Sequence, residues 1–225
     1  RSHQYALGGY YTGINGWEFS VEGYYKDMRN VLEYKDGVSF FGSSSGWENK
    51  VEMGKGRSAG IEFMAQKTAG KTTGWLSYTL SKSDRKFTKG GINNGEWFPY
   101  KYDRRHSINL TINHKFSDRI DIGASWVFYT GGTSTIPEEK TTVIRPHNGA
   151  NNGFLWYGTY DNTNSSPTIG DVSYIEHRNN FRLPASHRLN LGVNFNKKTK
   201  HGMRTWNISL YNAYNATDSF FYLYL

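Results

Sequence analysis

The feature that most constrains the fold is an alternation of apolar and polar residues that recurs in segment after segment of the chain. Successive side chains of a β-strand point to opposite faces, so this period of two predicts strands with one apolar and one polar face. The pattern is clear where Ile108, Leu110 and Ile112 are separated by asparagine and threonine. The chain is therefore expected to be all-β and antiparallel.

About nine segments are expected to be strands, and most of them are about ten residues long, whereas strands of soluble proteins typically have about 5 to 6 residues. Strands that cross a bilayer need about 9 to 11 residues. This length favours a meander forming a transmembrane β-barrel over a soluble carbohydrate-binding β-sandwich, whose strands also alternate. The expected strands are residues 5–13, 17–27, 57–67, 73–82, 104–116, 119–130, 186–197, 203–214 and 219–225.

In a membrane barrel, the apolar side of each strand faces lipid and the polar side lines the lumen. His114 has the lipid-facing parity beside a tight turn and is expected at the membrane interface. The residues expected to face lipid are Trp17, Phe19, Val21, Ile108, Leu110, Ile112, Ile120, Ile122, Trp126, Leu189, Leu191 and Val193.

Composition supports the barrel. Aromatic residues make up 16% of the chain and glycine occurs 25 times, although the mean hydropathy of -0.71 resembles that of a soluble protein. A barrel needs only a thin apolar skin, aromatic girdles and a polar interior. No apolar run approaches the roughly 20 residues of a transmembrane helix, and the absence of cysteine excludes disulfides and thiolate metal sites.

Short and long connections alternate along the chain, as they do in outer-membrane barrels, where short turns face the periplasm and long loops face outward. A small hairpin is expected at residues 31–41. An odd strand number and an open sheet edge are both incompatible with a closed bacterial barrel, so the chain is expected to be part of a larger one. The short turns are Gly13–Gly16, Thr68–Thr72, Ser117–Asp118 and Lys198–Gly202, and the long connections are residues 28–56, 83–103 and 131–185.

Four stretches of the chain are distinctive: "GRSAGIEFMAQKTAGKTTGWLSYTLSKSDRKF", "NNGEWFPYKYDRRHSINLTINHKFSDR", "RNNFRLPASHRLNLGVNF" and "TWNISLYNAYN". They resemble the C-terminal barrel of TonB-dependent receptors from Bacteroidetes, and the resemblance covers roughly residues 57–214. The most specific matches are Gly56-Arg57 with Gly60 and Glu62, Tyr102-Asp103-Arg104-Arg105-His106, and Tyr211-Asn212-Ala213-Tyr214-Asn215.

The resemblance implies a 22-stranded barrel in the bacterial outer membrane, closed by an N-terminal plug. It also implies TonB-driven import of a scarce solute such as an iron chelate, cobalamin, a glycan or a peptide. Residues 1–225 are then a partial barrel domain, with the plug and its TonB contact outside this chain. The alternative is a non-transporting outer-membrane barrel that acts as an adhesin or as a component of a complex with surface-exposed partner proteins.

Solute-binding candidates are the aromatic and basic residues of the long loops, because aromatic faces and cations suit sugars, aromatic chelates and anionic groups. Trp97 and Tyr100 lie near strand ends, where an interfacial aromatic belt explains them equally well. The preferred ligand-contacting residues are Arg145, His147, Trp156, Tyr157 and Tyr160.

Enzymatic chemistry is not expected. Asp103, His106 and Ser107 lie close in sequence, but in an extended strand His106 points away from Ser107, whereas a triad needs all its members within hydrogen-bond reach. Asp103 and Arg105 are instead expected to form an ion pair in the barrel wall. The seven dispersed histidines follow no metal-binding motif, and no glycine-rich segment leads from a strand into a helix, so no metal or cofactor is expected.

The net charge of +8 raises the question of nucleic acid, but the 27 lysines and arginines are scattered rather than gathered on one helix or arm. Nucleic acid is therefore not an expected partner. Basic groups at strand ends and in loops are expected to meet lipopolysaccharide phosphates beside the membrane lipid, or to attract an anionic solute.

Overall fold

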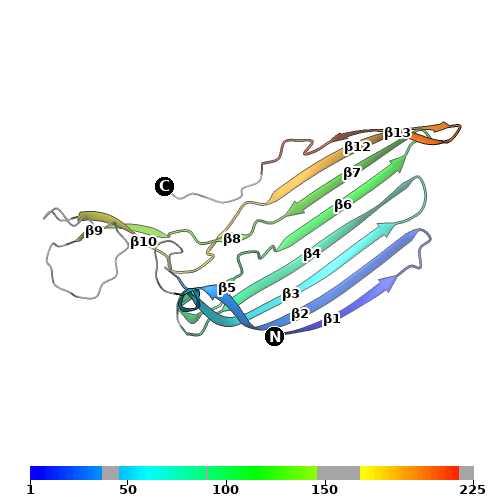
Figure 1. Ribbon diagram of the computed structural model, residues 1–225. Helices are drawn as coiled ribbons and strands as arrows, with labels where there is room; N and C mark the ends of the chain where they lie inside the picture. The colour runs from blue at the N-terminus through cyan, green and yellow to red at the C-terminus, as the bar shows by residue number, and fades with distance from the viewer. Residues whose placement is uncertain (37–45, 90, 146–167, 218–225) are drawn as a thin grey trace.

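The chain forms one curved antiparallel sheet, described by a computed structural model for residues 1–36, 46–89, 91–145 and 168–217 (Figure 1). Its eight long strands follow one another in chain order, and the short β5 (Phe98–Pro99) pairs with the fourth. The long strands are β1 (Ser2–Tyr11), β2 (Trp17–Tyr34), β3 (Val51–Lys67), β4 (Thr72–Lys86), β6 (His106–Lys115), β7 (Ile120–Tyr129), β12 (Ser186–Thr199) and β13 (Gly202–Leu210).

The pairing register brings the apolar sides of all eight long strands onto one face. Val21 lies opposite Phe63, Phe63 opposite Tyr78, Tyr78 opposite Ile108, and Ile108 opposite Phe128. The same alternation places every residue predicted to face lipid on this side, hereafter the apolar face, with the polar face opposite. The sandwich alternative is wrong, because these strands form one continuous sheet rather than two sheets packed together.

A β-bulge in β2 changes the alternation beyond the expected strand end. Asn30 adopts a positive φ of 58°, and the register with β3 shifts between Arg29 and Val31. An extra unpaired residue inverts the parity of the later residues of its strand. Val31 therefore lies on the polar side, opposite Gly54.

The small hairpin predicted at residues 31–41 lies partly outside the described residues, which end at residue 36 and resume at residue 46. Residues 31–34 instead continue β2 and pair with residues 51–54 of β3. The expected span 17–27 therefore ended too soon and the expected span 57–67 began too late, because local alternation shows neither the bulge nor the partner strand. The predicted strand 203–214 is too long, since β13 ends at Leu210 and a bend comes after it.

The four short turns lie together at one end of the sheet, at the right in Figure 1, and the long connections lie at the other. We call these the short-turn end and the long-loop end. The only buried apolar cluster among the described residues lies at the long-loop end and consists of Phe87, Ile92 and Phe98, with Val31 packed against it. The carboxylate of the buried Glu52 accepts hydrogen bonds from the backbone N–H groups of Lys89 (2.9 Å) and Gly91 (3.2 Å), so this loop is fastened to β3.

The connection predicted for residues 131–185 contains strands that the alternation did not reveal. Two of them, β9 (Glu139–Arg145) and β10 (Thr168–Tyr174), form a hairpin that extends away from the main sheet (Figure 1). The other two, β8 (Thr133–Ser134) and β11 (Phe181–Arg182), pair with each other. The strand expected at residues 219–225 lies outside the described residues.

The helical content of the described residues is limited to two single turns of 3-10 helix, η1 (Trp47–Lys50) and η2 (Asn93–Gly95). Neither has the length and apolar character that a helix needs to pass through a membrane.

Candidate functional site

Near the short-turn end, the polar face is crossed by a ladder of amide and carboxylate groups. The Asp121 carboxylate accepts hydrogen bonds from the side-chain amides of Asn194 and Asn196, both at 2.7 Å. The amide of Asn207 donates in turn to Asn194, also at 2.7 Å. These polar side chains satisfy one another across three strands, and none is left with an evident ligand-binding role.

At the long-loop end, the polar groups tie together segments that are distant in sequence. The buried carboxylate of Asp103 lies 3.1 Å from Arg105 Nε and 2.5 Å from Arg182 Nη2, and it accepts the backbone N–H of Ser83 at 2.6 Å. Arg182 also donates to the carbonyl oxygens of Asp103 (2.7 Å) and Gly131 (2.9 Å). The predicted Asp103–Arg105 ion pair is confirmed, whereas no local pattern indicated Arg182.

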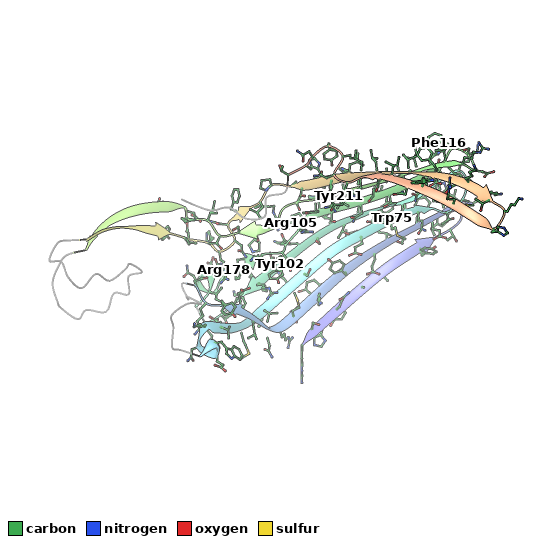
Figure 2. The ribbon with its side chains drawn as sticks, turned by 45° about the horizontal axis from the view of Figure 1, so that its top comes forward. Trp75, Tyr102, Arg105, Phe116, Arg178 and Tyr211 are labelled. Atoms are coloured by element: carbon green, nitrogen blue, oxygen red, sulfur yellow. The ribbon has the colours of Figure 1, made fainter. Side chains whose placement is uncertain are left out.

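A second arginine clamp joins the segment before β11 to the end of β2. The Arg178 guanidinium lies 2.9 Å from the Asp36 carboxylate and 3.3 Å from that of Glu33, and it donates to the Tyr34 carbonyl at 2.8 Å. The Arg178 backbone N–H donates to Asn93 Oδ1 at 2.6 Å. Figure 2 shows Arg178 at the long-loop end, together with Tyr102 and Arg105. Arg178 and Arg182 are therefore structural, because their charges are neutralised within the fold.

Three arginines on the polar face at the same end stack on tyrosine rings. The positions of Arg85, Tyr129 and Arg188 in their strands place these side chains on the polar face. Each of them takes part in a stack of a guanidinium over a tyrosine ring. The stacks are Arg85 over Tyr100 at 3.8 Å from the ring centroid, Arg104 over Tyr129 at 3.9 Å, and Arg188 over Tyr211 at 4.5 Å.

The two aromatic candidates near strand ends separate onto opposite faces. Tyr100 stacks with Arg85 on the polar face. Trp97 instead stacks at 4.3 Å with Arg57, which lies opposite Asp84 on the apolar side and binds its carboxylate at 3.0 Å. Tyr100 therefore remains a candidate for solute contact, whereas the position of Trp97 agrees with the interfacial interpretation.

The preferred ligand candidates cannot be placed. His147, Trp156, Tyr157 and Tyr160 lie outside the described residues, and for Arg145 only the backbone is described, at the end of β9 opposite Thr168. Sequence reasoning missed Arg85, Arg104 and Arg188. Alternation could have assigned Arg85 and Arg188 to the polar face, but nothing local indicated their tyrosine partners.

The residues considered for a catalytic triad are separated by the sheet. His106 Nδ1 is 2.9 Å from the Tyr78 hydroxyl on the apolar face, while the Asp103 carboxylate is held by Arg105 and Arg182. His114 is on the apolar face as predicted, with Nδ1 2.8 Å from Thr72 Oγ1. Within the described ranges, no three His, Cys, Asp or Glu side chains are grouped so that they could hold a metal ion.

The long strands form one continuous sheet with an apolar and a polar face, and short turns and long loops join them alternately. A sheet of this kind is the wall of a membrane barrel. The family model for "TonB dependent receptor-like, beta-barrel" matches residues 1–216. The chain belongs to this family. TonB-dependent receptor barrels are outer-membrane transporters and not enzymes, and the match extends the resemblance seen in residues 57–214 toward the N-terminus. A comparison with curated proteins gave no match.

Replacing Asp103 with asparagine should loosen the long-loop end of this receptor barrel. The change leaves Arg105 and Arg182 without their counter-charge, which costs about 3 to 5 kcal/mol when both partners are buried. Because these two side chains are 34% and 29% exposed, solvent screening should reduce this cost to about 2 to 3 kcal/mol. Hydrogen exchange of the amides around Asp103 and Arg182 should then accelerate roughly 30- to 150-fold.

The matched control is Asp118→Asn. Its carboxylate forms an ion pair with Lys115 at 2.8 Å but is 83% exposed in the turn between β6 and β7, so no measurable change is expected. Equal exchange in the two variants would show that Asp103 does not hold the loops.

Proposed function

We propose that the chain is the barrel part of a transporter that uses TonB to import a scarce solute across the outer membrane. The solute classes considered are iron chelates, cobalamin, glycans and peptides. The observation that carries the proposal is the unbroken register from β1 to β13, which keeps one side of the sheet apolar and the other polar. A wall of this kind separates lipid from an aqueous path. Family membership adds the coupling to TonB.

The described strands account for only part of such a wall. Among the described residues, β1 and β13 are the edge strands of the sheet, and unpaired backbone groups at a sheet edge are not tolerated in hydrocarbon. We propose that further strands complete a barrel of about 22, closed by a plug through which TonB acts. The quoted motifs support a receptor of the Bacteroidetes type.

We also propose an orientation for the barrel. The short-turn end faces the periplasm and the long-loop end faces outward, as in other outer-membrane barrels. The residues predicted to face lipid then lie in the membrane belt. His147, Trp156, Tyr157 and Tyr160 in the longest connection, with Arg145 at its edge, remain our candidates for contact with solute outside the cell.

Lipopolysaccharide is the proposed partner of the apolar side near the long-loop end. Lys55 and Lys86 lie directly opposite each other there, and like charges in this position repel. Among the described residues neither lysine has a carboxylate partner. A lipid A phosphate between them would remove the repulsion, while its acyl chains meet the apolar face below.

Import should depend on TonB and on a plug encoded upstream of Arg1. Iron chelates, cobalamin, glycans and peptides are supplied one at a time as the growth-limiting nutrient. A strain lacking this transporter and a strain lacking TonB should both fail to grow on the same one of them. The encoded sequence upstream of Arg1 provides the first check. Finding no plug domain there, or uptake that persists without TonB, would remove the proposal.

A lysine at Leu110 should destabilise the barrel, whereas a lysine at Thr111 should be tolerated. The two positions are adjacent in β6 and lie on opposite faces. A lysine facing lipid near the bilayer centre costs about 2 to 4 kcal/mol, whereas one in an aqueous lumen costs little. The free energy of unfolding of each variant is measured by urea denaturation of the receptor folded into lipid vesicles. Similar free energies of unfolding would contradict the assignment of the apolar face to lipid.

Binding of lipid A should require Lys55 and Lys86. Native mass spectrometry of the purified receptor should show bisphosphorylated lipid A retained in preference to its dephosphorylated form. The double variant Lys55→Gln/Lys86→Gln should lose this preference. Lys115→Gln, on the polar face at the short-turn end, serves as the control and should keep it. An unchanged preference in the double variant would refute this site.

A further inference from the structure

We propose that the three arginine–tyrosine stacks form a binding site for an oxyanion, so that the imported solute carries carboxylate, phosphate or sulfate groups. The identification of the ligand with the transported solute rests on the proposed function. The site itself does not depend on the proposed function, because its evidence is a set of contacts within the described residues.

The three stacks lie at neighbouring positions along the long-loop end. Arg85 lies near the end of β4, Arg104 just before β6, and Arg188 near the start of β12, so the stacks cover adjacent strands from β4 to β13. Three strand spacings separate β4 from β12, on the order of 14 Å. A solute with several anionic groups could contact more than one stack at once.

The guanidinium groups of the three stacks differ from other arginines of this end in their charge partners. Arg57, Arg178 and Arg182 each form ion pairs with carboxylates. Within the described part of the chain, Arg85, Arg104 and Arg188 have no such partner, because the nearby Asp103 carboxylate is already shared by Arg105 and Arg182. Tyrosine rings fix the position of the three groups without neutralising them. Their positive charge therefore remains available to a ligand.

Two of the stacks contain a hydrogen-bond donor that no described residue satisfies. The Nε atoms of Arg85 and Arg188 are buried and have no hydrogen-bond partner among the described residues. Buried polar groups nearly always have an acceptor, and each exception calls for an explanation. An oxyanion at the edge of the guanidinium would accept from Nε and a terminal nitrogen together, in the bidentate geometry that arginine forms with carboxylate and phosphate.

The stacks differ in this respect from a similar contact elsewhere. Arg204 lies over the Trp206 ring at 5.9 Å, but both are exposed in β13 toward the short-turn end, on the apolar side. There the guanidinium can be hydrated on its free sides. A cation over an aromatic ring is therefore not the distinguishing feature of the proposed site. The proposed site is distinguished by three features together: its arginines lie on the polar face, they have no carboxylate partner among the described residues, and two of them have a buried Nε without an acceptor there.

Calorimetric titration of the full-length receptor in detergent tests the site. The probes are inorganic phosphate, inorganic sulfate and citrate, with glycerol as the neutral control, at low ionic strength so that charge screening is weak. We expect binding of at least one anion and none of glycerol. The double variant Arg85→Met/Arg188→Met should weaken the dissociation constant at least tenfold, whereas Arg204→Met should leave it unchanged.

A heat-modifiable shift on a denaturing gel shows that each variant is folded. Absence of anion binding in the unaltered receptor, or equal affinity in the double variant, would overturn the site. Uptake that depends on TonB but is accompanied by neither anion binding nor sensitivity to these substitutions would refute this inference alone. Anion binding in a receptor without TonB-dependent uptake would refute the proposed function alone.

Discussion

The backbone hydrogen-bond ladder is the constraint on which the rest of the structure depends. Eight strands pair in chain order and every pairing is antiparallel, and four of the seven pairings are closed by short turns at one end of the sheet. A slip of one residue would turn all the side chains of a strand to the other face. The alternating sequence and the register therefore agree, because a slip by an odd number of residues would take Val21, Phe63, Tyr78 and Ile108 off their common side.

This constraint fixes the direction of the side chains in the middle of the sheet, whereas the backbone at the long-loop end can depart from the regular alternation. In the middle, side chains serve the apolar face or the polar ladder around Asp121. Beyond the regular strands, the bulge at Asn30 reverses the parity of β2 and turns Val31 toward the cluster of Phe87, Ile92 and Phe98. Loops can then fold back over the polar side, where Asp103 and Arg178 fasten them.

The arginines of the long-loop end divide into two groups by their partners. Arg178 and Arg182 connect distant segments through carboxylates and carbonyl oxygens, which makes them part of the scaffold. Arg85, Arg104 and Arg188 rest on tyrosine rings and keep their charge. A scaffold that holds cations in place, with no carboxylate partner among the described residues, is suited to recognising an anion, because little ordering remains to be done on binding.

The sequence by itself determined the all-β class, the meander order, the short turns, the two-faced strands and the Asp103–Arg105 pair. These depend on neighbours within a strand or a turn, where side-chain direction follows position alone. Only the tertiary structure decided the bulge, the β9–β10 hairpin, the attachment of Arg178 and Arg182, and the stacking of Arg85, Arg104 and Arg188 on tyrosine rings. Those contacts join residues brought together by sheet pairing and loop return, and such separations leave no periodic trace in the sequence.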